Sequence, residues 1–426
     1  MADLQAVEIC AGAGGQALGL ERAGFEHALA VELDPQAAAT LKENRPQWDV
    51  KVGDVANPGV WEPADFREVD LIAGGVPCPP FTIAGKQLGA TDERDLFAWA
   101  VKLAERVRPK ALLLENVRGL SANRFAAYRQ NVLDSLQNAG YSAQWKLLHA
   151  ADYGVPQLRP RFVLVAMLPE YAEFFSWPEP HGEERTTVGE ALYGMMAAKG
   201  WEGAEAWAAK ADQIAPTVVG GSKKHGGADL GPTRAKAAWA KLGVDALGIA
   251  NDGDVPGPGW EPADAKPGPK LTVEMVARIQ GWKPEDKWVF TGKKTSRYRQ
   301  VGNAFPPPVA EAVGESIARA LRQEGTPTKL VEATEVIHDP VYKLLRGMER
   351  PIGVEQIIGR LEKTGQRMSE PEVERHIAHL ERDFVIERIK RSSGSLGYTL
   401  GEFKAFTGQE EHERHELFSL NQAKIS

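Results

Sequence analysis

The sequence predicts an α/β protein built around a parallel sheet. Three observations support this prediction: short apolar runs of strand length, helical patterns between them, and a glycine-rich turn after the first run. The expected strands cover 6–11, 28–31, 50–52, 69–73 and 111–114, and the expected helices cover 16–23, 35–44 and 95–107. Strands that alternate with helices form βαβ units, in which the strands lie parallel.

Later segments complete this domain and add others. Runs at 141–149 and 161–167 are expected to form an antiparallel strand pair. The following stretch is rich in glycine, proline, alanine and tryptophan with weak periodicity, which predicts a smaller irregular domain. Apolar residues then recur every fourth position from Val309 to Leu321, as on one face of a helix that returns to the first domain. The expected domains are 1–168 with 290–325, 169–289, and a tail, 331–426.

The tail carries its own signals. Ser369 and Glu372 form a capping box, with Pro371 inside the first helical turn. Two strand-like runs around 392–395 predict a hairpin, and helices followed by a hairpin resemble a winged-helix module. Its 14 basic and 17 acidic residues give a net charge of −3. Both DNA contact and protein contact therefore remain open as roles for the tail.

Charge is distributed unevenly along the chain. The net charge of −7 over 426 residues, taken alone, argues against a nucleic-acid partner. Residues 210–241, however, hold six lysines and arginines against two aspartates, and 293–299 hold four more basic side chains. Phosphate groups bind to such local patches, so nucleic acid remains a candidate partner.

The composition also excludes several classes. No apolar run approaches the roughly 20 residues that a membrane span needs, and the first residues lack a signal-type pattern, so we expect a cytoplasmic protein. The two cysteines, Cys10 and Cys78, have neither zinc-site spacing nor the numbers of a disulfide scaffold. No metal site is expected.

The glycine-rich turn at 11–15 lies between a strand and a helix, where a backbone can approach a nucleotide-like ligand closely. Glu32 ends the second strand, 17 positions after Gly15, close to the spacing of a carboxylate that binds ribose hydroxyls. Asp54 follows the third strand and is a candidate for an adenine amino group. A tight structural turn would explain the glycines alone, but not the two carboxylates at successive strand ends.

Three further groups point to chemistry. Cys78 follows Pro77 at a strand-to-loop turn, a position suited to a nucleophilic thiolate, although an inert buried thiol is the commoner role. Glu115 follows a strand, where burial would raise its pKa; a solvated strand-end charge is the simpler alternative. Gln157, Arg159 and Arg161 alternate as on one face of a strand. These side chains suit an anionic or carbonyl partner.

Taken together, these residues resemble the DNA cytosine-5 methyltransferase family. The resemblance covers nearly all of 6–322 through six ordered motifs. They are 10–15, Pro77-Cys78, Glu115-Asn116-Val117, 157–161, 271–281 and Arg299-Gln300-Val301-Gly302-Asn303-Ala304. Three positions depart from the family pattern. Cys10 replaces a phenylalanine that packs on the cofactor, Pro79 replaces a common glutamine, and Trp282-Lys283-Pro284 stands where Phe-Pro is common.

The resemblance implies a Rossmann-like S-adenosylmethionine-dependent domain, a target-recognition domain at 169–289 and methyl transfer to carbon 5 of a flipped-out cytosine in double-stranded DNA. It implies Cys78, Glu115, Arg159 and Arg161 as catalytic residues. The implied cofactor residues are Cys10, Ala11, Gly12, Gly14, Gly15, Glu32, Leu33, Asp54, Val55, Pro77, Leu96, Asn303 and Ala304. The implied DNA contacts are Lys86, Gln87, Gln157, Thr217, Lys223, Lys224, His225, Arg234 and Arg297. Apart from the resemblance, the glycine-punctuated segment 85–90 is a candidate lid over the substrate.

Two alternatives share the scaffold: an RNA cytosine-5 methyltransferase, and a catalytically silent DNA-binding homologue. The intact set of Cys78, Glu115 and Arg161 disfavours the silent homologue. The hundred-residue variable region favours DNA, because reading sequence in a duplex needs a large groove-facing element. A separately encoded restriction endonuclease is a candidate partner.

Overall fold

A seven-stranded sheet in the order β3-β2-β1-β4-β5-β7-β6 forms the centre of the computed structural model. The model describes residues 4–77, 96–122, 125–182, 185–220, 228–328, 339–348, 350–391 and 394–403. The strands are β1 (Leu4–Ile9), β2 (Phe25–Glu32), β3 (Val50–Val52), β4 (Leu71–Gly74), β5 (Ala111–Val117), β6 (Ser142–His149) and β7 (Pro160–Met167). Within this sheet β7 is antiparallel to both of its neighbours, β5 and β6, and the remaining pairs are parallel. The first five strands follow the order of doubly wound nucleotide-binding sheets, so the expected sheet and its late antiparallel pair are confirmed.

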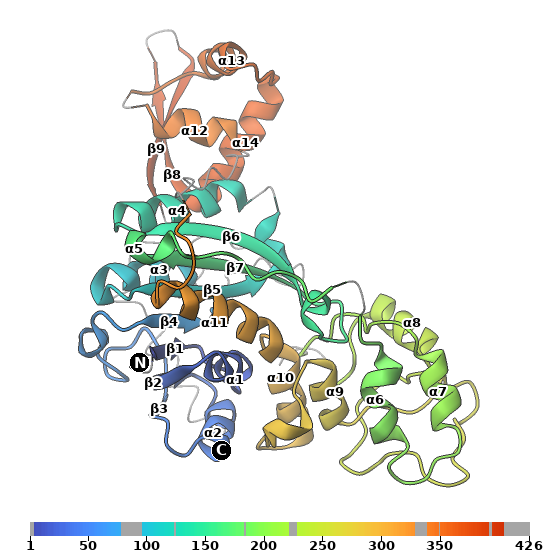
Figure 1. Ribbon diagram of the computed structural model, residues 1–426. Helices are drawn as coiled ribbons and strands as arrows, with labels where there is room; N and C mark the ends of the chain where they lie inside the picture. The colour runs from blue at the N-terminus through green and yellow to red at the C-terminus, as the bar shows by residue number, and fades with distance from the viewer. Residues whose placement is uncertain are drawn as a thin grey trace.

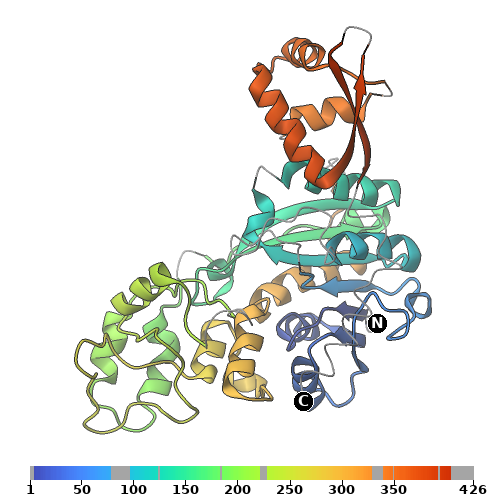
Figure 2. The ribbon, with the colours of Figure 1, turned by 180° about the vertical axis from the view of Figure 1, so that it is seen from behind.

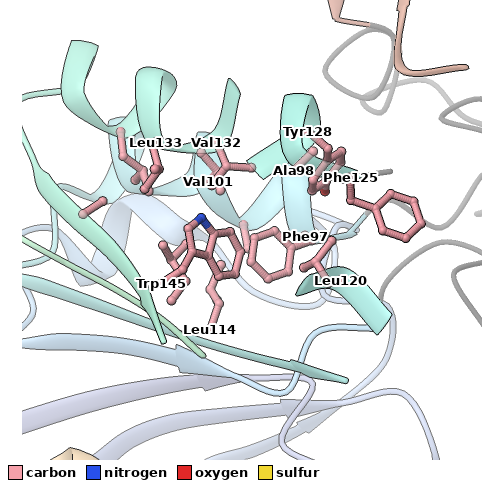
Figure 3. Packing of buried hydrophobic residues seen from close by; sticks show 14 of the residues in the cluster. Phe97, Ala98, Val101, Leu114, Leu120, Phe125, Tyr128, Val132, Leu133 and Trp145 are labelled. Atoms are coloured by element: carbon pink, nitrogen blue, oxygen red, sulfur yellow. The ribbon is translucent and has the colours of Figure 1, made fainter. Parts of the chain in front are cut away.

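Helices cover both faces of this sheet (Figure 1). They are α1 (Gly15–Arg22), α2 (Pro35–Asn44), α3 (Leu96–Val107), α4 (Ala126–Asn138), α5 (Pro169–Ala172) and α11 (Pro307–Leu321). Alternate residues of β5 face opposite layers: Leu112 and Leu114 pack with α3 and α4, whereas Leu113 packs with α11. In Figure 3 the rings of Phe97 and Trp145 stack between α3 and the sheet, 5.4 Å apart. The return of the 307–321 helix to the first domain is confirmed.

A second unit has its own apolar core and extends away from the sheet, as Figures 1 and 2 both show. Its helices are α6 (Val188–Met196), α7 (Ala204–Lys210), α8 (Thr233–Lys241), α9 (Val273–Ile279) and α10 (Lys294–Asn303). Tyr298 and Val301 of α10 belong to this core. Packing therefore continues past residue 289, the expected end of the unit, because α10 packs against α9 while its C-terminal end reaches the sheet domain.

The tail contains α12 (Pro340–Arg346), α13 (Val354–Lys363), α14 (Glu370–Asp383), β8 (Phe384–Lys390) and β9 (Leu396–Phe403). The capping box at Ser369 and Glu372 is formed, and β8 pairs with β9 as an antiparallel hairpin. Asp134 of α4 joins the tail to the sheet domain, because it forms an ion pair with Arg346 at 2.6 Å and accepts a hydrogen bond from Tyr342 at 3.4 Å. Among the described helices, none is long and apolar enough to cross a membrane.

Two expectations about residues at strand ends are wrong in ways that matter for the site. β5 extends to Val117 because it pairs with β7 along its whole length, so Glu115 lies within the strand rather than after it. β7 begins at Pro160, so Gln157 and Arg159 precede the strand. The expectation that Gln157, Arg159 and Arg161 share one strand face is therefore wrong.

Candidate active site and cofactor cavity

The loop after β1 has a backbone that ordinary side chains disfavour. Cys10, Gly12 and Gly14 have φ values of 52°, 58° and 88°, in the left-handed region that favours glycine. A Cβ on Gly14 would lie 2.4 Å from the ring of Trp288, and one on Gly15 would lie 2.4 Å from the carbonyl oxygen of Phe305. Both positions therefore require glycine, because 288–305 packs directly against the loop.

A cavity of about 290 Å³ opens beside this loop, at the carboxyl ends of the parallel strands. Among the residues expected to bind the cofactor, those that line it are Cys10, Ala11, Gly12, Gly15, Glu32, Leu33, Asp54, Val55, Pro77, Leu96, Asn303 and Ala304. Gly14 caps α1 instead and is absent from the lining. The strand ends thus converge as the parallel topology predicts.

Glu32 lies in the wall of this cavity. Its carboxylate accepts hydrogen bonds from the backbone N–H groups of Gly12 and Asp34, each at 2.7 Å. Burial raises the pKa of Glu32, and these backbone hydrogen bonds oppose the rise. The carboxylate therefore fixes the glycine loop, and its remaining lone pairs can accept hydrogen bonds from a ligand.

Two buried polar side chains that line this cavity have atoms without a hydrogen-bond partner among the described residues. Neither amide atom of Gln16 makes a hydrogen bond, and Glu8 Oε1 makes none, although Glu8 Oε2 lies 2.9 Å from His27 Nε2. Buried atoms of this kind usually have a partner, in protein, water or ligand. The glycine cradle, the acidic side chains at one end and these amide and carboxyl atoms fit a nucleoside that carries a charged substituent, as S-adenosylmethionine does.

A second cavity of about 630 Å³ adjoins the first. The two share Gly75, Pro77, Glu115 and Asn303 in their linings. The second is also bounded by Arg161, and by Thr217 and Gly220 from the segment that precedes α8. It therefore lies between the sheet domain and the second unit, next to the cofactor cavity.

Glu115 and Arg161 form a buried ion pair in the wall of the second cavity. Glu115 Oε1 lies 2.5 Å from Arg161 Nε, and both side chains are about nine-tenths buried. Burial raises the pKa of Glu115, opposed by the positive charges of Arg161 and Arg159. Burial also lowers the pKa of Arg161, opposed by Glu115. This pair offers a carboxyl group and guanidinium N–H groups to one small polar molecule.

Arg159 has a different place from the one expected. Its side chain is buried, and its guanidinium donates to the carbonyl oxygens of Val218 at 2.7 Å and of Gly302 and Ala304 at 2.8 Å. Arg159 therefore joins the segment around Val218 to the C-terminal end of α10. Arg159 also lines the second cavity. An arginine with these bonds positions the cavity wall.

Gln157 is not placed to contact DNA. Its side chain is fully buried, and its amide bonds Gln280 Oε1 at 2.7 Å, the Ile279 carbonyl at 3.2 Å and the Val218 N–H at 2.7 Å. The expected DNA contact is therefore corrected to an internal link between the sheet domain and the second unit.

Other expected DNA contacts have mixed positions. Arg234 is exposed on α8, and Thr217 lines the second cavity while its hydroxyl donates to the Leu158 carbonyl. Arg297 on α10 pairs with Asp252 at 2.6 Å, so phosphate binding there would have to displace a carboxylate. Cys78, Lys86, Gln87, Lys223, Lys224 and His225 lie outside the described residues, as does the expected lid at 85–90. Pro77, which precedes Cys78, lines both cavities.

Several residues that line the two cavities were missed from the sequence, among them Asn116 and Gln16. The Asn116 side chain donates to the Val76 carbonyl at 3.0 Å and so holds the segment that leads to Pro77. Gln16 lines the cofactor cavity. The only available signal for Gln16 was a polar residue at the start of an otherwise apolar helix, Ala17-Leu18-Gly19-Leu20.

Comparisons with known proteins show which proteins this chain resembles. The chain is 59% identical over 427 residues to the Type II methyltransferase M.NaeI of Lentzea aerocolonigenes, with 100% of both chains covered. It is 51% identical over 321 residues to the Type II methyltransferase M.NgoMIV of Neisseria gonorrhoeae, covering 75% of this chain and 98% of that protein. In fold, it is similar to the solved structure of the methyltransferase EhMeth of Entamoeba histolytica, with a TM-score of 0.50 at 13% identity, covering 76% of this chain and 99% of that one.

The family model of the C-5 cytosine-specific DNA methylases matches residues 4–319, well over half of the chain. That range includes both cavities and the whole sheet. The methyl donor of this family is S-adenosylmethionine. With the match, the two relatives and the site geometry in agreement, this chain belongs to the C-5 cytosine-specific DNA methyltransferases.

Proposed function

We propose that the second cavity receives a cytosine flipped out of duplex DNA, with Cys78 as the nucleophile, Glu115 at ring nitrogen 3 and Arg161 at the carbonyl oxygen. The single observation that carries this assignment is the buried Glu115–Arg161 pair in a cavity that also meets the cofactor cavity. A base inside the stack cannot reach these groups, and extruding it costs a few kcal/mol.

In the proposed reaction the Cys78 thiolate adds to carbon 6, and the electrons of the 5,6 double bond make carbon 5 nucleophilic. Glu115 stabilises the negative charge that develops at nitrogen 3, and Arg161 holds the oxygen. S-Adenosylmethionine supplies an electrophilic methyl group to carbon 5. Loss of the proton from carbon 5 then restores the double bond and expels the Cys78 thiolate.

The residues proposed to hold the cofactor are those expected from the sequence that line the first cavity. Glu32 and Asp54 are assigned to the nucleoside end, because carboxylates accept hydrogen bonds from ribose hydroxyls and an adenine amino group. The opposite end of the cavity, at Pro77 and Asn303, adjoins the proposed base pocket.

Transfer of a tritiated methyl group tests the assignment. We expect wild-type protein to label carbon 5 of cytosine in mixed-sequence duplex DNA, and Cys78→Ser to label nothing while keeping its affinity for the cofactor product. Parallel incubation with tRNA separates the RNA alternative, because label on tRNA alone would refute a DNA substrate. Cofactor binding without label on either nucleic acid would indicate the silent homologue.

We further propose the division into a catalytic domain, 1–168 with 290–325, and a target-recognition domain, 169–289, whose DNA contacts include Lys223, Lys224, His225 and the exposed Arg234. Direct base reading by such side chains is worth about 1–3 kcal/mol for each good bidentate contact. Changing Arg234 to methionine should lower DNA affinity and its salt dependence without changing cofactor affinity; unchanged DNA binding would remove Arg234 from the interface.

For the tail we propose a winged-helix module. Its support is the order of three helices and a hairpin, together with a bridge between Ile352, which precedes α13, and Tyr398 of β9. Arg388 and Lys390 are exposed on the hairpin. Reversing both charges should weaken DNA affinity if the tail contacts DNA, and should alter self-association or partner binding alone if it contacts protein.

Finally, we propose a restriction–modification role in the cytoplasm, since both relatives described above carry Type II names. The partner would be a separate endonuclease that cuts the same sequence. DNA methylated by this enzyme should resist that endonuclease, and cleavage of fully methylated DNA would refute the pairing.

A further inference from the structure

Gln16 lies in the first turn of α1 and is buried, with 4% of its surface exposed. Neither its amide nitrogen nor its amide oxygen has a hydrogen-bond partner within the described part of the chain. A buried polar group without a partner destabilises the folded protein, and native proteins keep few of them. Gln16 lines the cofactor cavity, so a ligand in that cavity can supply the missing partners.

The position of Gln16 within the cavity is given by Gly75. A Cβ built on Gly75 would lie 4.0 Å from Gln16 Oε1 and 3.4 Å from Glu115 Oε2. Gly75 lines both cavities, whereas Gln16 lines only the first. The amide therefore lies on the cofactor side of the junction, next to the reacting groups proposed above.

A primary amide presents one acceptor and two donors on a single planar group. Its complement is a ligand with an anionic acceptor and a cationic donor close together, which is the arrangement of an amino-acid zwitterion. With the nucleoside assigned to Glu32 and Asp54, the amino-acid end of the methyl donor falls toward the Pro77 and Gly75 end of the cavity. Hydrogen bonds to charged groups are also the strongest that an amide can make.

We propose that Gln16 binds the methionine end of S-adenosylmethionine, its amide N–H group donating to the ligand's carboxylate and its amide oxygen accepting from the ligand's ammonium. This inference rests on the cofactor cavity proposed above. Gln16 would thereby fix the donor end of the cofactor, whereas Glu32 fixes the nucleoside end.

The test compares two ligands that differ only at the proposed contact. S-Adenosylhomocysteine contains the amino-acid end, and 5′-methylthioadenosine has the same nucleoside and sulfur without it. Calorimetric affinities are measured for full-length wild type, Gln16→Met and Glu32→Gln. We expect Gln16→Met to weaken S-adenosylhomocysteine binding about 10-fold or more and to leave methylthioadenosine within about 2-fold.

Glu32→Gln is the matched control for the other end and should weaken both ligands together. The unfolding midpoint of ligand-free Gln16→Met should equal or exceed that of wild type, because an unpaired buried amide has been removed. This combination of unchanged or higher stability with lower affinity is not expected of a merely structural glutamine.

Three results would overturn the inference. Equal weakening of both ligands by Gln16→Met would make its effect a general one on the cavity. If Gln16→Met leaves both affinities and kcat unchanged, the Gln16 amide contacts neither ligand nor substrate. If it leaves both affinities unchanged but lowers kcat, the amide acts on the cytosine instead. Failure of wild type to bind either ligand would refute the cavity assignment itself, which separates that failure from an error about Gln16.

Discussion

Three ionisable side chains, Glu115, Arg159 and Arg161, are buried together beside the second cavity. Two guanidinium nitrogens of Arg159, Nη1 and Nη2, donate to backbone carbonyls, and its charge acts on Glu115 through space. Burial raises the pKa of Glu115 more than the two arginines lower it. The carboxyl group thus stays protonated to higher pH than an exposed glutamate, and it can donate a hydrogen bond to a ring nitrogen.

This shift gives the reaction a pH dependence with a definite sign. If methyl transfer requires protonated Glu115, its rate is highest below the raised pKa of Glu115. The rate then falls as the pH rises through that pKa. We expect kcat of wild type to fall on the alkaline side. In Glu115→Gln that fall should disappear, while kcat drops about 100-fold because the amide cannot deliver a proton.

The measurement is single-turnover methyl transfer across pH, with cofactor affinity as the control for an intact cavity. A Glu115→Gln variant that keeps the wild-type alkaline limb would assign that limb to another group.

Residue positions were predictable from the sequence where they depend on strand ends. Glu32, Asp54 and Glu115 were found because parallel strands bring their carboxyl ends to one edge of a sheet. Gln157 and Arg159 were wrongly assigned to a strand, because polar residues two positions apart also occur in connecting segments. Their hydrogen-bond partners, such as Val218 and Gly302, lie 59 to 145 positions away along the chain, and contacts of that range leave no local periodicity.

At the scale of elements, the sheet and its covering helices could be predicted because their burial alternates with the period of each element. The helices of the unit after β7 could not, since they span only seven to ten residues and are held by distant contacts. One such contact joins the segment before α8 to α10. A Cβ on Gly302 would lie 2.5 Å from the Cα of Gly220, so the two backbones cross in direct contact.

This crossing should be required for activity. In Gly220→Ala the new methyl group would lie 2.1 Å from Oδ1 of Asn303, which lines both cavities, and must push it aside. We expect kcat/KM for DNA to fall on the order of 100-fold, the effect of misplacing a cavity wall by about 1 Å. Steady-state kinetics on duplex DNA measure it.

Gly194→Ala in α6 is the control from the same unit. Open space surrounds the position, and alanine is favoured over glycine in a helix by about 1 kcal/mol. That variant should be fully active. If Gly220→Ala keeps the wild-type kcat/KM, the contact between the backbones at Gly220 and Gly302 can shift without loss of activity.

On the scale of the whole molecule, the tail and the second unit lie at opposite ends of the sheet domain (Figures 1 and 2). The tail's apolar core is continuous with the core of the sheet domain, through residues such as Tyr342 and Leu345. Both cavities, by contrast, are lined entirely by residues that precede the tail. The tail therefore contributes to stability through α4 without reaching the described site.

A chain that ends at Thr328 should consequently remain a methyltransferase. The family model ends at residue 319, and M.NgoMIV matches this chain over 321 residues that make up 98% of its own length. We expect kcat within a few fold of the full chain, with a free energy of unfolding lowered by about 2–4 kcal/mol, because the Arg346–Asp134 pair and the packing of Tyr342 are lost. Urea unfolding and methyl transfer are measured on the same preparation.

Asp134→Ala in the full chain separates the two contributions, since it removes the ion pair and keeps the tail. Loss of methyl transfer in a folded, cofactor-binding 1–328 chain would show that the tail takes part in holding DNA, and would extend the working surface of the enzyme beyond the two cavities.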